Sequence, residues 1–133
     1  MNWRFFVPGP LPGLNEMIAA AKGCGGRGVL YSKMKAKWTG GIALIILAER
    51  LPKLKRIQCE FEWISTDKRH DPDNIEAAQK FIWDALCPKS KGKPGAGVIE
   101  NDGWEQNAGS SHRHSIGPKP GVWVTIIDAS NGG

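Results

Sequence analysis

Three carboxylates stand at turn-like positions in a chain that is otherwise basic. Asp71 and Asp73 lie within residues 68–74, and Asp102 lies in the Asn-Asp-Gly sequence at residues 101–103. Carboxylate oxygens are the hard ligands that Mg²⁺ prefers, and Mg²⁺ commonly partners phosphate groups in enzymes. Carboxylates that converge repel one another unless a cation lies between them. The pattern predicts a Mg²⁺ site that acts on phosphodiesters, provided that the fold brings the three side chains together.

A turn and a helix must position the first two of these side chains. Pro72 fixes its own φ angle and pushes Asp71 toward extended backbone. Asp73 or Asn74 is then expected to cap a helix over residues 75–86. Lys80 would lie on the same side of that helix as Asp73 and would neutralise charge on a phosphate during hydrolysis. The same residues also fit an ordinary turn with a helix cap, and Asn-Asp-Gly is a common turn, so the local pattern leaves that alternative open.

The remaining chain predicts an α+β fold. β-branched and aromatic residues predict strands at residues 3–7 and 122–127, and alternation of apolar and polar residues predicts a strand at residues 56–64. The polar residues 104–115 are expected to form a further strand with a bulge at Gly109. Apolar residues at helical spacing predict helices at residues 33–51 and 75–86. Residues 23–28 are rich in glycine and predict a mobile loop. The order of these elements indicates one two-layer domain over residues 1–133, with a mixed β-sheet and about two main helices.

The charge of the chain favours a polyanionic partner. Its 133 residues include 18 Lys and Arg against 13 Asp and Glu, which gives a formal net charge of +5. Cys24, Cys59 and Cys87 form no Cys-x-x-Cys pair, which argues against a zinc ribbon or a redox motif and favours a reducing compartment. The longest apolar run, residues 42–48, is too short to cross a bilayer, and no signal pattern opens the chain. We therefore expect a soluble intracellular protein without a membrane partner.

The combination of motifs resembles the RusA family of Holliday junction resolvases, which phages and prophages often encode. The resemblance rests on residues 69–74, on Asp84-Ala85-Leu86 at the end of the following helix, on residues 97–104 and on the Pro-rich segment 10–15. It covers most of the chain and implies a RusA-like fold. It also implies a homodimeric endodeoxyribonuclease that uses Mg²⁺, with Mn²⁺ expected to substitute. Such an enzyme places paired nicks in four-way DNA junctions during recombination and repair, here in the cytoplasm, or in the host cytoplasm if a phage encodes the chain.

The resemblance also assigns residues to roles. Asp71, Asp73 and Asp102 match the metal-binding acids of the family. Many members carry a functional Lys three positions after the Asn that follows the second acid, where this chain has Ala77, so Lys80 is the candidate for that role. The candidate DNA-binding residues are Asn15, Lys68, Arg69, His70, Asn74, Lys89, Lys91 and Lys93. The last three could equally belong to a solvated loop, and that loop looks longer than in compact members of the family.

Other interpretations remain open. Because Ala77 stands where many family members have a functional Lys, a second hypothesis is a non-catalytic accessory protein that has the same fold and binds branched DNA. A third hypothesis is a protein without any nucleic-acid role. His112 and His114 stand two apart on a strand and are interpreted as surface histidines. Most tryptophans are expected in the core or a dimer interface. Trp104 is expected near the site, where its packing would hold the turn of Asp102. The apolar residues 42–47 are expected in a dimer interface or in the core.

Overall fold

The computed structural model describes residues 2–22 and 28–130 of the chain. These residues form the elements β1, α1, α2, β2, α3, α4, β3 and β4 in that order. The loop predicted at residues 23–28 lies outside the described residues apart from Gly28, and so does Cys24.

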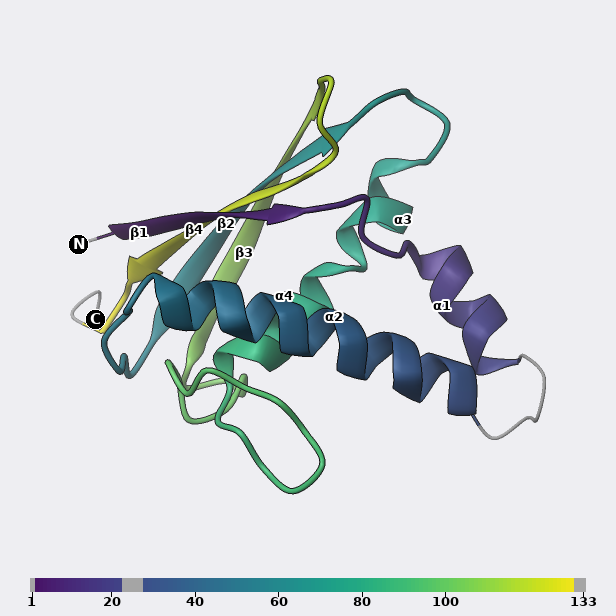
Figure 1. The fold of residues 1–133 in the computed structure, drawn as a ribbon. Helices are drawn as coiled ribbons and strands as arrows, with labels where there is room; N and C mark the ends of the chain where they lie inside the picture. Colours follow the sequence, from purple (N-terminus) through teal and green to yellow (C-terminus); the bar gives the residue numbers. More distant parts are fainter. Residues whose placement is uncertain (1, 23–27, 131–133) are drawn as a thin grey trace.

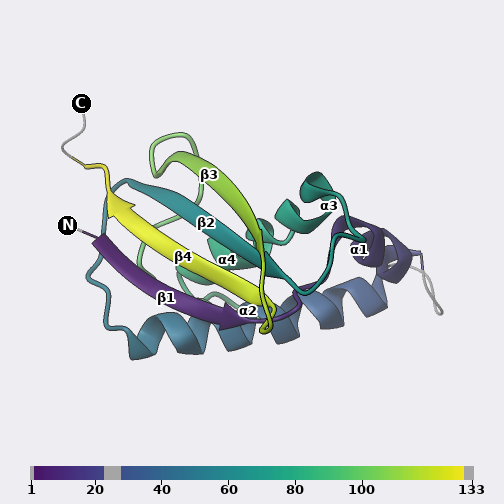
Figure 2. The same ribbon diagram turned by 90° about the horizontal axis from the view of Figure 1, so that it is seen from above.

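The four strands form one mixed sheet. Its spatial order is β1-β4-β2-β3, with β4 antiparallel to both of its neighbours and β3 parallel to β2 (Figures 1 and 2). The strands are β1 (Asn2–Pro8), β2 (Ile57–Ser65), β3 (Asn107–Ile116) and β4 (Gly121–Asp128). The pairing register of β2 and β3 shifts between Ile57 and Cys59, which face Asn107 and Ser110. Gly109 lies within this shift at a φ of 118°, so the predicted bulge is confirmed.

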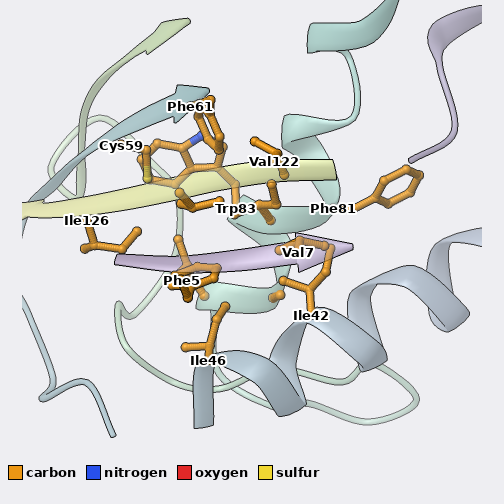
Figure 3. Close-up of a cluster of buried hydrophobic side chains, with 14 of the residues drawn as sticks. Phe5, Val7, Ile42, Ile46, Cys59, Phe61, Phe81, Trp83, Val122 and Ile126 are labelled. Carbon is orange, nitrogen blue, oxygen red and sulfur yellow. The ribbon is translucent and has the colours of Figure 1, made fainter. Parts of the chain in front are cut away.

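Alternating side chains explain why β2 and β4 hold the centre of the sheet. Ile57, Cys59, Phe61 and Trp63 are buried on one face of β2, while the residues between them are more exposed. Alternate residues of β4 are buried in the same way. Figure 3 shows side chains of β1, β2, β4, α2 and α4 gathered in this core. The burial of these apolar side chains holds the sheet against the helices.

The helices lie on one face of the sheet, which makes the predicted two-layer α+β arrangement (Figure 2). They are α1 (Leu14–Ala21), α2 (Val29–Ala48), α3 (Pro72–Glu76) and α4 (Gln79–Leu86). The long helix α2 buries Thr39, Ile42, Ala43 and Ile46, whose spacing puts them on one side. None of the helices in residues 2–22 and 28–130 is long and apolar enough to cross a membrane.

Two helical boundaries differ from the expectations. The helix predicted at residues 33–51 begins earlier, directly after Gly28, which has a left-handed backbone. The single helix predicted at residues 75–86 is instead the pair α3 and α4, because residues 77 and 78 form a turn between them. The amides of Ala78, Lys80 and Phe81 bond carbonyls only three residues back, which tightens the chain. Phe81 and Trp83, which follow the break, are both buried in the core.

The pair α3 and α4 connects two parallel strands. A connection of this kind leaves the sheet at one end and must return to the opposite end before the next strand begins. The segment after β2 and the segment before β3 therefore lie at opposite ends of the sheet, as Figures 1 and 2 both show. This topology decides which of the predicted site residues can meet.

Candidate functional site

Asp71 and Asp73 lie where the chain leaves the sheet and enters α3. Asp71 has extended backbone, with φ −69° and ψ 150°, directly before Pro72. Proline is tolerated at the first helical position because the N–H that it lacks would have no partner within the helix. Asp71 is therefore the N-cap residue, and the prediction that Asp73 or Asn74 takes this position is wrong.

The side chains of both aspartates are available to a ligand. Asp71 and Asp73 are exposed, and the carboxylate of Asp71 makes no capping hydrogen bond. Neither carboxylate forms an ion pair with any residue in the described part of the chain. Lys68, Arg69 and His70 precede them and are also exposed. Two exposed carboxylates two residues apart offer oxygen ligands to a cation on a basic surface.

Asp102 lies at the other end of the helical connection. The turn that follows it is tied to the beginning of β2, because the carbonyl of Gln106 accepts a 2.8 Å hydrogen bond from the amide of Ile57. Cys87, directly after α4, is close enough for the charge of Asp102 to affect the pKa of its thiol. Burial raises the pKa of the Cys87 thiol to about 11, and the charges of Asp102 and Asp84 add to this effect.

The three carboxylates therefore do not converge within one chain. Among residues 2–22 and 28–130, no three side chains of His, Cys, Asp or Glu form a group that could hold a metal ion. The physical reason is the parallel pairing of β2 and β3, which puts Asp71 and Asp73 beyond the end of one strand and Asp102 before the start of the other. The condition attached to the sequence prediction is not met inside a single chain, and the metal-binding roles stay a prediction.

Asn74 joins the Pro-rich segment to α3. Its Oδ1 accepts a 2.9 Å hydrogen bond from the backbone amide of Asn15, and its Nδ2 lies 3.5 Å from Nδ1 of His70. A Cβ atom on Gly13 would lie 2.5 Å from Nδ2 of Asn74, so this close approach needs a glycine. The structure thus brings together three of the predicted DNA-binding residues, Asn15, His70 and Asn74, through contacts that are themselves structural.

A pocket of about 260 Å³ opens beside these contacts. Its walls come from the Pro-rich segment, the start of α1, the end of β2 and the loop before α3. Arg69 and His70 line it, and Arg69 also pairs with Asp67 at 3.4 Å. A second hollow of about 310 Å³ contains Asp71 and Lys68. The cluster of basic and acidic groups predicted at residues 68–73 is thus assembled at one end of the sheet.

Lys80 is placed differently from the expectation. It is exposed at the start of α4, so the break after α3 puts Asp73 and Lys80 on separate helices. Asp84 faces α2, where its Oδ2 lies 3.3 Å from Nζ of Lys35. The buried Oδ2 has no hydrogen-bond partner among the described residues, so its contact with Lys35 is an ion pair without hydrogen-bond geometry. Ala77 is half-buried against the core, which accounts for a small residue there.

His112 is not a surface histidine. It is half-buried on β3, stacks on Phe61 at a ring distance of 5.1 Å and accepts a 3.0 Å hydrogen bond at Nδ1 from the indole of Trp63. Burial lowers the pKa of His112, and the nearby His114 lowers it further, while the charge of Glu76 opposes the change. The interpretation as a surface residue is wrong because β3 pairs with β2 and turns this side chain toward the helices.

Two further contacts were not anticipated from the sequence. Nε2 of His114 lies 2.6 Å from Oε2 of Glu76, which links the edge strand to α3. Nη1 of Arg56 donates to the carbonyls of Trp104 and Glu105 at 3.0 and 3.2 Å, which holds the turn after Asp102. The prediction that the packing of Trp104 holds this turn is wrong, because its side chain is 95% exposed. For the contact of His114 with Glu76, the two-residue spacing of His112 and His114 on a strand was the available sequence signal. No local sequence pattern indicates the contact of Arg56 with the turn.

The loop lysines lie on a tight turn. Residues 90 and 93 exchange two backbone hydrogen bonds of 3.0 and 2.8 Å. Lys89, Lys91 and Lys93 are all exposed around it. Lys93 also lines a hollow of about 470 Å³ between this loop, α2 and α4. The lysines are therefore accessible to an anionic partner, as a solvated loop would also be.

A comparison of the chain with models of known protein families matched none of them, and a comparison with curated proteins found no similar sequence.

Proposed function

We propose that the protein is a Mg²⁺-dependent endonuclease that nicks branched DNA, in the manner of the RusA-type resolvases that its motifs resemble. The observation that carries the proposal is the pair Asp71 and Asp73. Both carboxylates are exposed, the Asp71 carboxylate is not used in capping, and both follow three exposed basic residues. Neither carboxylate has an ion-pair partner among the described residues, whereas a metal and a phosphate would use both together with the neighbouring cations.

Two carboxylates are enough to bind a Mg²⁺ ion, and a third carboxylate is proposed to complete the active site. This ion is commonly held by one or two carboxylates, while water and the phosphates of the substrate complete its coordination. Asp71 and Asp73 have hard oxygen donors and fit this requirement. Bound Mg²⁺ would neutralise phosphate charge and supply an acidified water. Arg69 and Lys68 would hold the DNA backbone beside the carboxylates, because phosphate contacts dominate the affinity of proteins for DNA.

The place of Asp102 calls for a second subunit. Within one chain Asp71 and Asp73 follow the end of β2 and Asp102 precedes the start of β3, so the parallel pairing of these strands puts them toward opposite ends of the sheet. In the proposed homodimer, Asp102 of one subunit completes the site of the other. A four-way junction has approximate twofold symmetry, so two such shared sites would face two strands of the same junction.

Mixed dimers test the proposal. Subunits carrying Asp73→Asn and Asp102→Asn are produced together with two different affinity tags, and the mixed dimer is isolated through both tags. In a shared site, this dimer keeps one intact site and one doubly altered site. We expect each parent dimer to be inactive and the mixed dimer to nick a labelled junction at about half of the wild-type rate.

The control is a mixed dimer of wild-type and Asp73→Asn subunits, which also keeps one intact site. Equal activity of the two mixed dimers supports a site shared between subunits. Activity in the control but none in the Asp73→Asn and Asp102→Asn pair would place all three carboxylates in one chain. No Mg²⁺-dependent product from the wild-type protein on any junction would contradict the nuclease itself.

A second function has its own support. Among the described residues, one chain holds no group of three metal ligands, and Ala77 occupies the position of the functional family Lys. These observations favour an accessory protein that binds branched DNA without cutting it. It predicts salt-dependent binding to a junction with no product at any concentration of Mg²⁺ or Mn²⁺.

A further inference from the structure

Trp104 is presented to solvent on a firmly held turn. Its side chain is 95% exposed, whereas the other five tryptophans are buried or half-buried. The carbonyl of Trp104 accepts a 3.0 Å hydrogen bond from Arg56, and the amide of Gly103 donates at 2.7 Å to Oδ1 of Asn101. Since the backbone is fixed on both sides of the residue, the indole ring is held outward rather than displaced by a frayed loop.

An open hollow of about 560 Å³ adjoins the turn, with Trp104 among its lining residues. Arg56, Asp102 and Asn107 bring a cation, a carboxylate and an amide to its lining, and the bulge at residues 108–109 forms another part. Oδ1 of Asn107 accepts a 2.8 Å hydrogen bond from the amide of Gly109, which orients the side chain and leaves its NH₂ group for a ligand. A Cβ atom on Gly109 would meet nothing within 4 Å, so the space over the bulge is free.

The chemistry of this hollow selects among possible occupants. A protein partner would be expected to bury Trp104 within a ring of apolar side chains, and the hollow has no other large apolar residue. An aromatic face with a guanidinium, an amide and a carboxylate beside it instead matches the needs of a nucleobase. The base stacks on the ring, and its edge exchanges hydrogen bonds with the polar groups.

We propose that Trp104 and this hollow hold one unpaired nucleobase of a branched DNA, with the base stacked on the indole ring. The proposal rests on the proposed function and names the feature of the substrate that the protein reads. Bases inside a continuous duplex have both faces covered by their neighbours, so a free face exists only at a branch point, an end or a single strand. Because Asp102 lines the same hollow, the captured base lies beside a predicted metal-binding acid.

The test uses full-length protein in EDTA, so that DNA binding is measured without cleavage. Four-way junctions carry a photoreactive 5-iododeoxyuridine either at the branch point or in the middle of an arm. We expect cross-linking to Trp104, mapped by mass spectrometry, from the branch position only. Trp104→Ala is expected to bind the junction about 10-fold more weakly or worse, and Trp104→Phe to keep most of the affinity because it keeps an aromatic face.

Leu30→Ala is the matched control. Leu30 is an apolar side chain at the start of α2 that is 43% exposed, so its loss removes exposed apolar surface away from the turn. Unchanged junction affinity in Trp104→Ala, or cross-links that map elsewhere, overturns the inference while leaving the nuclease proposal intact. A third outcome is that the wild-type protein is a dimer, that Trp104→Ala is largely monomeric, and that the remaining Trp104→Ala dimers bind the junction as tightly as the wild type. This outcome would place the indole ring against a second copy of the chain and would also overturn the inference. Absence of wild-type binding to junction, duplex and single strand alike would contradict both proposals.

Discussion

Nε2 of His114 on β3 lies 2.6 Å from Oε2 of Glu76 on α3, and the two side chains are about one quarter exposed. This contact fastens the short helix that follows Asp71 to the edge of the sheet. A five-residue helix has little stability of its own, so its position depends on tertiary contacts of this kind.

Replacing Glu76 with Gln therefore weakens the attachment of α3. We expect the free energy of unfolding to fall by about 0.5–1 kcal/mol, since the contact is partly exposed to solvent. Urea denaturation measures the change. Glu60→Gln is the control, because Glu60 is exposed on β2 and makes no ion pair with a described residue. An equal loss in both variants would show that the Glu76 contact contributes nothing specific.

His112 makes stability depend on pH. Its pKa is lowered in the folded protein, mainly by burial, so the unfolded chain takes up a proton at a higher pH than the folded chain. The contribution of His112 is complete above its ordinary pKa of 6.5 and is lost as the pH falls from there toward the lowered value. His112→Gln is expected to flatten the fall in unfolding free energy over this range, and His70→Gln, at an exposed position, serves as the comparison. A ring-proton NMR titration of His112 with a midpoint above 6.5 would contradict the prediction.

Two glycines predict opposite effects of the same substitution. A methyl group on Gly13 would lie 2.5 Å from Nδ2 of Asn74, so Gly13→Ala must displace the side chain that binds Asn15. We expect a loss of about 1–3 kcal/mol in unfolding free energy. Gly41→Ala lies inside α2, and the new methyl group would meet nothing within 4 Å. There we expect a gain of up to about 1 kcal/mol, because alanine favours the helix. Thermal unfolding of the two variants checks the opposite signs.

The reactivity of the Cys87 thiol tests whether Asp102 lies near the end of α4. Burial first, and then the charges of Asp102 and Asp84, raise the pKa of this thiol to about 11. At pH 8 we expect iodoacetamide to modify Cys87 roughly 100-fold more slowly than free cysteine, since the thiolate is the reacting form. Asp102→Asn should speed the reaction, and Lys55→Gln, at an exposed position, should not. Peptide mass spectrometry gives the rates. Equal rates in the wild type and Asp102→Asn would mean that Asp102 does not lie near the end of α4.

Asp73→Asn separates binding from cleavage. The substitution removes a carboxylate that is exposed in the first turn of α3, so it is expected to leave the fold intact. We expect junction cleavage to fall by at least about 100-fold, because removing a metal ligand or its close support commonly costs that much. Junction affinity in EDTA should be equal or higher, since one charge that repels phosphates is gone. Full cleavage by Asp73→Asn would rule out the proposed metal site.

The parts of the fold that follow local patterns were predictable from the sequence. The alternation from Ile57 to Trp63 and the β-branched run of β4 led directly to the two central strands. Gly109 marked the bulge because glycine readily takes a positive φ angle. The boundaries of helices were less predictable, because apolar spacing over residues 75–86 does not show the turn at residues 77–78 that separates α3 from α4.

The candidate site was predictable only in its first half. Asp71, Asp73 and their basic neighbours are close in sequence, so a turn suffices to assemble them. The position of Asp102 depends on whether β3 pairs parallel or antiparallel with β2, and no local pattern carries this information. The pairing also decides that His112 faces Phe61 and that His114 reaches Glu76.

The bulge in β3 has a consequence for how copies of the chain can associate. β3 is an edge strand, and its open edge would be a template for adding another strand. A bulge increases the local twist of such an edge, and the exposed Arg113 places a charge on it. The opposite edge, β1, ends in Pro8, which has no amide hydrogen to give. Both edges therefore carry features that oppose sheet extension, and the proposed homodimer is expected to join through helices or loops rather than through one continuous sheet.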